Sequence, residues 1–491
     1  MRKAILIPAF TALVTVFCSN NDSLDPDVRG LILARQLKGD ASIGRVIPKP
    51  TDTISHLGKL LFFSKALGGD KDSACVTCHH PMLGGGDNLP LSIGVGAHQP
   101  DLLGPGRSHP GGKFTVPRNA PTTFNIVLYD SFLFDDGRVE SIGKTPLKNG
   151  DDGMGIRTPE SFTNIADPQA TSNLVQAQAL FPVTSSQEMK GSTFESTINN
   201  PIVNNPLVRN HLAARLGNYG AGTSELTINS WLIEFQKAFS SLGQDAQTLI
   251  TYKNIAIALS EYQRSQLFIN NSWKRYIEGD NNAISVTAKQ GALLFYKEVG
   301  SGGGGCFNCH QGDFFTDEKF HVLAVPQVGE GKADGPDGTD DFGRFKVTFK
   351  ESDKYAFRTP SLLNIEMTSP YGHTGVFSSL EAIIKHHSNV KRSVETFSYT
   401  SLDPAIDTSH AVKNTAKALA KLEANRAAGL PSISDTNLSD NEIRQLVEFL
   451  KTLTDPCLKD RACMSPWLIS SEDIDPDGLR VIAVDKNGTS L

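Results

Sequence analysis

The pattern Cys-x-x-Cys-His occurs twice in this chain, at residues 75–79 and 306–310. It is typical of covalent haem attachment, in which two thiols form thioethers with the porphyrin and the histidine ligates the iron. A zinc site made of two Cys-x-x-Cys pairs is the alternative, but it would leave both adjacent histidines without a role. The fold must therefore enclose two haem c groups, which we expect to be held by Cys75, Cys78, His79, Cys306, Cys309 and His310.

The length of 491 residues allows two or more hydrophobic cores, since single domains usually contain about 100–200 residues. Apolar residues recur at helical spacing over 252–266 and 286–296. Stretches rich in Gly, Asp and Pro indicate long loops at 84–116, 144–170 and 328–341. We expect a mainly α fold with few strands, divided into a first haem domain over 25–279, a second over 283–455 and a C-terminal extension over 456–491.

Charge and the first residues limit the class of protein. The net charge of -6 leaves no basic stripe for nucleic acid. A charged start, Met1-Arg2-Lys3, precedes the apolar run 4–17, which predicts a signal peptide over 1–18 and a periplasmic or cell-envelope location. Cys18 is either the acylated cysteine of a lipoprotein, and so a lipid anchor, or part of an ordinary cleaved leader.

Two cysteines remain outside the leader and the haem motifs, Cys457 and Cys463. A disulfide between them suits an oxidising compartment. Two free thiols are the alternative.

Short motifs around the haem sites resemble the bacterial di-haem cytochrome c peroxidase family, which includes MauG-like enzymes that oxidise a partner protein. The resemblance covers residues 50–455 and rests on Arg-Asn-Ala-Pro-Thr at 118–122, Phe-Asp-Asp-Gly-Arg at 134–138, Asp-Phe-Gly-Arg at 341–344, Arg-Thr-Pro-Ser-Leu at 358–362 and Pro-Tyr-Gly-His-Thr-Gly at 370–375. It implies two cytochrome c-like domains facing each other across a calcium ion, with a peroxidatic haem in the first and an electron-transfer haem in the second. It also implies hydrogen peroxide as substrate, a small cytochrome c or cupredoxin as electron donor, and a homodimer.

Peroxide reduction needs an open iron position and an acid–base group that moves a proton from the inner to the outer oxygen. In the family a distal glutamate has this role, and Gln178, Pro182 and Glu188 reproduce the family's spacing. The resemblance thus implies Glu188 as the catalytic acid–base, with Gln178 and Pro182 in the same site. A glutamate in a loop is otherwise simply solvated.

The segment that closes the first haem in classical family members is altered here. Those proteins carry Ser-Ile-Gly-His-Gly, whose histidine blocks the resting iron, whereas residues 92–96 are Ser-Ile-Gly-Val-Gly. Because Val95 cannot ligate iron, we expect an open first haem that needs no reductive activation. A stand-in histidine is the alternative, with His98 ahead of His80 and His109; each can equally be a surface residue.

The second haem needs a sixth ligand for electron transfer with little reorganisation. The family has Met or Tyr fourteen residues after the histidine of its Pro-Tyr-x-His motif, and that position, counted from His373, is His387. Bis-histidine ligation and a potential below that of the Met-ligated relatives are therefore expected. His386 is the alternative by one residue, and two solvated histidines in the last turn of a helix are the other reading.

The family's calcium ligands correspond to Asn119, Thr368 and Pro370. An all-oxygen set suits this hard cation, although Asn119 can also simply hold a turn. The acidic run 334–341 is either a second calcium candidate or a solvated loop.

One residue departs from the family at the expected contact between the haems. Where relatives have Trp, this chain has Asp135, which has no aromatic orbital to relay an electron. Electrons then cross more slowly, or another ring such as Phe134 or Phe132 fills the gap.

The leading hypothesis is an exported di-haem peroxidase that reduces hydrogen peroxide. A MauG-like oxidase of a partner protein is the second hypothesis, favoured by Val95 and weakened by Asp135. A non-catalytic di-haem electron carrier or redox sensor is the third, and Glu188 argues against it because a carrier needs no distal acid.

Overall fold

The computed structural model describes residues 24–162, 165–170, 172–194 and 201–491. The predicted signal peptide and Cys18 lie outside these residues. In the part of the chain that is described, no helix is both long and apolar enough to cross a membrane.

Helices dominate the described residues, and the strands are only two or three residues long. The α-helices are α1 (Asp25–Ala34), α2 (Thr53–Phe63), α3 (Cys75–Cys78), α4 (Leu174–Gln178), α5 (Pro201–Gly217), α6 (Trp231–Ala238), α7 (Ala246–Leu249), α8 (Tyr252–Arg264), α9 (Ser272–Ile277), α10 (Val286–Tyr296), α11 (Phe345–Thr348), α12 (Leu380–Ser388), α13 (Val390–Glu395), α14 (Ala411–Ala427), α15 (Asp440–Lys451) and α16 (Arg461–Met464). The prediction of a mainly α fold with few strands is confirmed.

Two small antiparallel sheets complete the fold. The first has the order β1-β2-β3 and consists of β1 (Phe132–Leu133), β2 (Val139–Ser141) and β3 (Ile156–Arg157). In the second, β4 (Phe320–Val322) pairs with β5 (Ala356–Arg358), so that Phe320 lies opposite Arg358. This pairing holds Arg358 in a fixed position next to the loop that carries Asp135.

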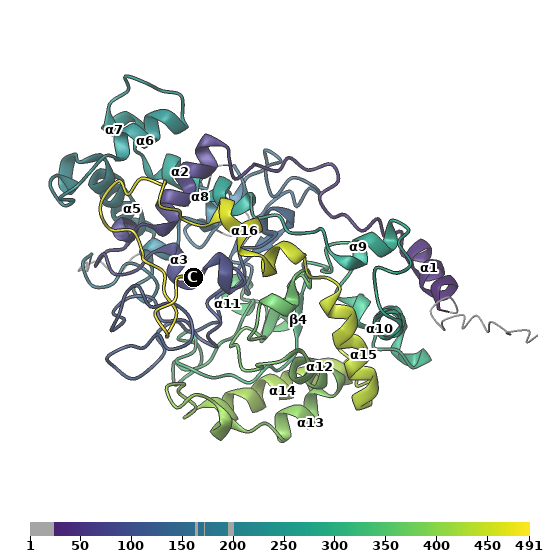
Figure 1. Cartoon of the computed structure of the whole chain (residues 1–491). Coiled ribbons are helices and arrows are strands. Elements are labelled where there is room, and N and C mark those ends of the chain that lie inside the picture. Colours follow the sequence, from purple (N-terminus) through teal and green to yellow (C-terminus); the bar gives the residue numbers. More distant parts are fainter. Residues whose placement is uncertain (1–23, 163–164, 171, 195–200) are drawn as a thin grey trace, which may run out of the picture.

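Two helix pairs of the same construction organise the two halves of the chain. Gly58 on α2 packs against α8: a Cβ there would come 1.9 Å from the carbonyl oxygen of Ala258. Gly291 on α10 packs against α15 in the same way, and its Cβ would come 1.9 Å from the carbonyl oxygen of Gln445. Because only glycine allows this approach, both crossings are close backbone contacts. Each pair begins with the helix that precedes a haem motif (Figure 1).

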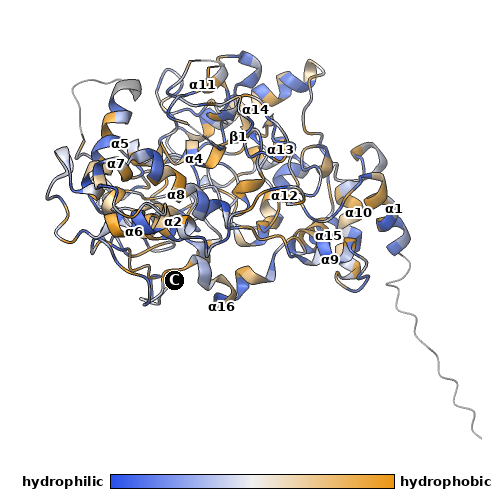
Figure 2. Ribbon diagram, turned by 90° about the horizontal axis from the view of Figure 1, so that it is seen from above, coloured by the Kyte–Doolittle hydropathy of each residue, from blue (hydrophilic) through white to orange (hydrophobic). Residues whose placement is uncertain are grey.

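The apolar cores follow these pairs. One core gathers buried residues of α2, α4, α5, α6 and α8, and the other gathers those of α1, α9, α10, α12 and α15. Figure 2 shows apolar stretches of α8 and α10 within the two groups of helices. A capping box begins α15, where the Ser439 side chain accepts from the Glu442 backbone N–H.

The first described helix packs on the core of the second half, and the segment after α15 packs on the core of the first half. The two cores therefore do not divide the chain at a single point. Helix α1 lies beside α10 (Figures 1 and 2), where Asp25 pairs with the buried Lys289 at 2.7 Å. The segment after α15 returns to the first core, where Lys59 Nζ lies 3.0 Å from Asp473 and the N–H of Val481 donates to a carbonyl of α2. The extension expected over 456–491 is thus packed against the first half.

The cysteines of this returning segment form a disulfide. Cys457 and Cys463 are bonded to each other, as the sequence predicts. The four haem-motif cysteines form no disulfide.

Candidate active site

One continuous cavity of about 660 Å³ reaches both Cys-x-x-Cys-His motifs. Its lining includes all six residues expected to attach haem, namely Cys75, Cys78, His79, Cys306, Cys309 and His310. The first motif forms α3 and the second a short 3-10 helix over Cys306–Asn308, so in both the chain turns tightly enough to direct thiols and histidine into one space. The two motifs, far apart in the sequence, therefore open into a shared interior.

The motif histidines are held in the form that ligates iron. His79 Nδ1 lies 3.1 Å from the Gly85 carbonyl oxygen, and His310 Nδ1 lies 3.1 Å from that of Phe315. A ring N–H that donates to a carbonyl leaves the lone pair on Nε2. Burial lowers the pKa of His79, and it lowers that of His310 to about 4, so both rings stay neutral near pH 7. These orientations fit a haem c at each motif.

Glu188 lines the same cavity as His79, together with Gln178 and Pro182. Its backbone N–H donates to Ser185 Oγ at 3.3 Å, whereas no side chain or N–H of a described residue donates to its carboxylate. Burial raises the pKa of the Glu188 carboxyl, although the positive charges of Arg138 and Lys332 act in the opposite direction. The structure thus brings the three predicted residues together around a carboxyl that is free to exchange protons.

The altered segment 92–96 lies next to Glu188 but sends no ligand into the cavity. Val95 donates its N–H to the Gln187 carbonyl at 3.4 Å and is not part of the lining. His80, His98 and His109 are also absent from it. None of the three candidate stand-in histidines therefore reaches the cavity.

Each of the three histidines has another environment. His80 is buried, its ring edge-on to Phe63 at 6.0 Å, and its Nδ1 accepts from Met82. His98 is exposed. His109 accepts at Nδ1 from the Gly111 N–H at 3.0 Å. The stand-in reading, with His98 leading, therefore has no support from the geometry.

The structure separates the two candidate ligands of the second haem. His387 lines the cavity with His310, and its Nδ1 lies 2.8 Å from the Ile383 carbonyl oxygen, which leaves Nε2 available. His386 is fully buried outside the cavity, with Nε2 2.8 Å from the Leu323 carbonyl oxygen and Nδ1 3.0 Å from Ser393 Oγ. Because both nitrogens of His386 are occupied, only His387 of this pair can ligate iron.

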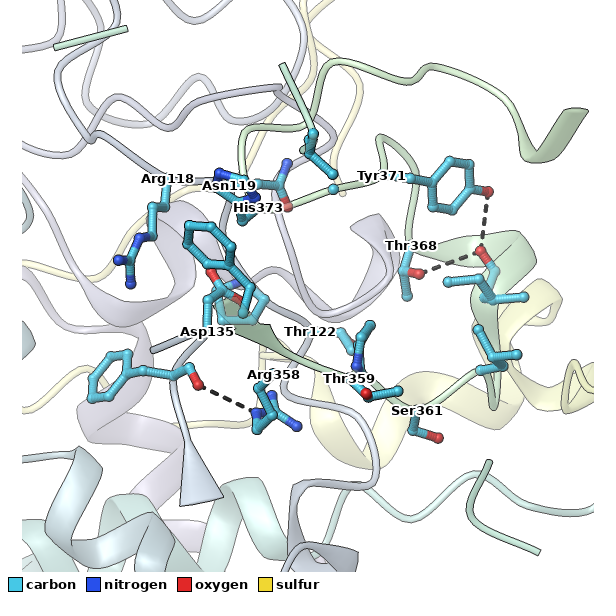
Figure 3. A pocket seen from close by; sticks show the side chains of 18 of the residues that line it. Arg118, Asn119, Thr122, Asp135, Arg358, Thr359, Ser361, Thr368, Tyr371 and His373 are labelled. Carbon is cyan, nitrogen blue, oxygen red and sulfur yellow. Dashed lines mark hydrogen bonds between the residues drawn. The ribbon is translucent and has the colours of Figure 1, made fainter. Parts of the chain in front are cut away.

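Asp135 lines the cavity into which both motifs open. Its carbonyl oxygen accepts from the Arg358 N–H at 2.8 Å, and Arg358 Nε donates to the Phe134 carbonyl at 3.2 Å (Figure 3). Burial raises the pKa of the Asp135 carboxyl, while Arg118 and Arg358 oppose this. Of the two replacement rings, Phe134 lines the cavity, whereas Phe132 packs on Phe320 at 4.9 Å outside it.

Sequence reasoning missed one ring in this wall. Tyr129 lines the cavity, stands edge-on to Phe314 at 4.7 Å and accepts at its hydroxyl from the Ser361 N–H at 3.1 Å. Arg358 covers its face at 4.2 Å. Tyr129 belongs to no sequence motif, so only its tertiary contacts reveal it.

A buried ion-pair cluster joins three of the family-like motifs. Arg118 donates to Asp136 at 2.7 Å and holds Asp341 through two bonds of 2.7 and 2.8 Å. The parallel pair of bonds fixes the guanidinium geometrically as well as by charge. Residues 118–122, 134–138 and 341–344 thereby meet at one point on the cavity wall.

The proposed calcium ligands Asn119, Thr368 and Pro370 all line the cavity. Asn119 donates from Nδ2 to the carbonyls of Leu89 and Pro90, at 2.8 and 3.2 Å, so its Oδ1 is left to accept or ligate. Figure 3 shows Asn119 and Thr368 in the same region of the wall. An amide oxygen of this kind with backbone carbonyls fits a hard cation.

The acidic run 334–341 is engaged by cations of the protein itself. Its carboxylates pair with Lys346 at 3.0 Å, Lys413 at 2.5 Å and Lys417 at 2.9 Å, and Asp341 pairs with Arg118. A calcium ion would have to displace these lysines. The run is therefore better explained as an ion-paired loop than as a metal site.

Two haem-attachment motifs open into one cavity, one with the half-buried carboxyl of Glu188 and the other with a second imidazole, and this arrangement is that of a di-haem c-type protein. The model of the family described as di-haem cytochrome c peroxidase matches residues 52–282. Together with the relatives below, this match shows that the chain is similar to the di-haem cytochrome c peroxidases and MauG-like proteins.

Curated relatives carry both kinds of name. Cytochrome c551 peroxidase of Pseudomonas aeruginosa is 26% identical over 320 residues, which are 65% of this chain and 67% of that protein. Methylamine utilization protein MauG of Methylorubrum extorquens is 28% identical over 331 residues, 67% of each chain.

Solved structures agree at the level of the fold. A MauG-like protein associated with microbial copper homeostasis superposes with a TM-score of 0.53 at 21% identity, covering 86% of this chain and 95% of that one. The diheme peroxidase BthA from Burkholderia thailandensis has a TM-score of 0.50 at 18% identity, covering 90% and 93%.

Proposed function

We propose that this protein is an exported di-haem peroxidase that reduces hydrogen peroxide to water. Electrons would come from a small cytochrome c or cupredoxin through the second haem site. The overall reaction consumes one peroxide, two protons and two electrons and forms two waters. The observation that carries this proposal is Glu188, a half-buried residue whose carboxylate accepts no hydrogen bond from a described residue and lines the same cavity as His79.

A haem c held by Cys75, Cys78 and His79 would supply the iron at which the O–O bond is cleaved. The protein's own part is proton handling. Because burial raises the pKa of Glu188, its carboxyl keeps a proton closer to neutral pH than an exposed glutamate does. It can therefore accept a proton from the inner peroxide oxygen and return it to the outer one, which leaves as water.

The two haem sites would differ in the residues opposite the motif histidine. Val95 and the three nearby histidines stay out of the first site, which favours direct access for peroxide. His387 lines the second site with a free Nε2, which favours bis-histidine ligation with His310. A six-coordinate iron changes its geometry little on reduction, so the second site suits electron transfer.

Several finer points belong to the same proposal. Export and a periplasmic or envelope location follow from the expected leader over residues 1–18, and a lipid anchor at Cys18 is one outcome of its processing. Calcium at Asn119, Thr368 and Pro370 is favoured by the free Oδ1 of Asn119. A homodimer rests on the family resemblance alone.

Spectroscopy of the fully oxidised protein tests the proposal. We expect one high-spin and one low-spin ferric haem by EPR and absorption, and a high-spin signal that disappears within seconds of adding peroxide. Glu188→Gln should lower turnover by about 10²–10⁴-fold, the usual contribution of a general acid–base, without changing either spectrum. Glu330→Gln is the matched control, since Glu330 is exposed, outside the cavity, and bonded to Gln187 beside Glu188. Two low-spin haems that ignore peroxide would contradict any peroxidase.

Oxidation of a partner protein, as in MauG, is the second candidate. The open first site and the similarity to MauG favour it, whereas Asp135 in place of an inter-haem aromatic residue argues against shared charge between the haems. The two candidate functions differ in which molecule is oxidised when peroxide is reduced. A peroxidase oxidises the donor cytochrome stoichiometrically, whereas a MauG-like oxidase modifies residues of an added substrate protein.

A further inference from the structure

A shallow apolar groove lies on the surface between α13, the loop that follows it, and α14. It has a volume of about 500 Å³ and is lined by Val394, Glu395, Phe397, Tyr399, Val412, Ala416, Leu419, Ala420 and Glu423. Val412 on α14 is 66% exposed, an unusual position for an aliphatic side chain within an apolar patch. An exposed apolar patch with a polar rim is typical of an interaction site. The groove lies outside residues 52–282, which the family model matches.

A row of rings leads from this groove to the second haem site. Tyr399 and Phe397, in the groove, have their centroids 4.9 Å apart. Phe397 then lies 5.9 Å from Phe377, Phe377 lies 4.8 Å from His386, and His386 lies 6.1 Å from His387. Each step is within the ordinary range of aromatic contacts.

The row is rigid at its inner end. His386 is held at both nitrogens, by the Leu323 carbonyl and by Ser393 Oγ. It is therefore a fixed ring between Phe377 and His387. This explains why a fully buried histidine stands beside the expected ligand without being able to ligate iron itself.

We propose that this groove is the docking surface of the electron-donor protein and that the row Tyr399, Phe397, Phe377, His386 and His387 carries the electron inward. This inference rests on the proposed function, in which electrons enter at the second haem. Electron tunnelling falls off steeply with the width of each gap, so closely spaced rings favour transfer along this line. A surface linked in this way to an iron ligand has a specific use only for a redox partner.

The size and charge of the groove indicate the kind of partner. Nine residues line it, whereas a stable interface engages about 20–30 residues on each side, so the surface fits a short-lived encounter better than a second copy of this chain. Of its two acidic residues, Glu423 pairs with Arg426 at 2.8 Å. Contact would thus be mainly apolar, with a partner that presents an apolar patch around its redox centre.

The first test compares Val412→Glu with Ile233→Glu. Ile233 is an aliphatic residue on α6, 53% exposed and far from the groove in sequence, so both changes put a charge on an exposed helix position. Peroxide turnover is measured with reduced soluble cytochrome c and, on the same sample, with a small-molecule reductant. The ratio of the two values of kcat/KM should fall about tenfold for Val412→Glu, equivalent to about 1.4 kcal/mol of binding, and should not change for Ile233→Glu.

The same measurements distinguish failure of the docking proposal from failure of the proposed function. Equal ratios in both variants would overturn the docking proposal while leaving the proposed function intact. Absence of peroxide turnover with the small-molecule reductant in the natural protein would contradict the proposed function instead. A dimer that dissociates only in Val412→Glu, seen by sedimentation, with an unchanged ratio would assign the groove to a second copy and also overturn the proposal.

The second test needs no natural donor. A photosensitiser attached at Val412→Cys injects an electron at the groove, and transient absorption follows reduction of the second haem. Adding Phe397→Leu should slow this reduction several-fold, because it removes one ring of the row while keeping an apolar side chain. With the photosensitiser at Ile233→Cys, Phe397→Leu should have no effect. Equal rates with and without Phe397 in the Val412→Cys protein would rule out the row as the route.

Discussion

Gly94 lies directly against the backbone of Glu188. A Cβ added at Gly94 would come 2.4 Å from the Glu188 carbonyl oxygen and 2.8 Å from its Cα. The altered segment 92–96 therefore supports the expected acid–base residue through its backbone, even though Val95 sends nothing into the cavity. This segment has become a positioning element for the first site.

Gly94→Ala should impair peroxide reduction by displacing Glu188. Because the obstructing atoms are backbone, they must shift, and a misplacement of about 1 Å can lower activity on the order of 100-fold. We expect such a loss in kcat/KM for peroxide, with the spectrum of the second haem unchanged. Gly300→Ala, where nothing lies within 4 Å, is the control. Normal activity of Gly94→Ala would show that Glu188 does not depend on this contact.

His387→Ala should convert the second haem from low spin to high spin. Removing the imidazole opens the sixth position of the iron, which EPR and absorption detect directly. His386→Ala should keep the low-spin spectrum but lower the free energy of unfolding by about 1–3 kcal/mol, because buried partners lose their hydrogen bonds. The opposite pattern would assign ligation to His386.

Gly58→Ala and Gly291→Ala should each destabilise one helix crossing. The added methyl group meets a carbonyl oxygen at 1.9 Å, and such overpacking typically costs about 1–3 kcal/mol. Gly30→Ala on α1 has open space around it and should instead stabilise the helix by about 0.5–1 kcal/mol. Denaturant unfolding, followed separately at the two haems, measures each effect. An unchanged free energy of unfolding in Gly58→Ala and Gly291→Ala would mean that the helices do not cross as closely as described.

Asp87→Asn should stabilise the protein at neutral pH. Burial raises the pKa of Asp87 to about 6, so from about pH 4 to pH 6 the unfolded chain loses this proton while the folded protein retains it. The free energy of unfolding of the natural protein therefore falls over that window, by up to about 3 kcal/mol. The gain from Asp87→Asn should be absent at pH 4 and complete at pH 7.

Asp403→Asn provides the comparison for that titration. Like Asp87, it accepts from the N–H two residues ahead, but it is exposed. It should show no such pH-dependent gain. An equal gain in both variants would mean that the effect belongs to the turn and not to burial.

The sequence carries more information about the chemistry than about the arrangement of the two halves. Haem attachment, the carboxyl at 188 and the disulfide depend on residue types at short spacing, which the chain shows directly. The paired crossings at Gly58 and Gly291 were not visible, because one glycine in a helix has no meaning until its partner helix is known. The return of residues 456–491 to the first core also depends on contacts between segments that are remote in sequence.

By itself, the sequence predicted two haem groups and the six residues that would hold them, because thioether formation and proximal ligation need only a five-residue spacing. The tertiary structure decided which distal groups face the cavity. His386 and His387 are adjacent, yet about 100° of helix rotation separates their side chains, so one bonds to Leu323 and Ser393 while the other lines the cavity. The histidines near the first site are likewise kept out by the packing of their loops, which no local pattern records.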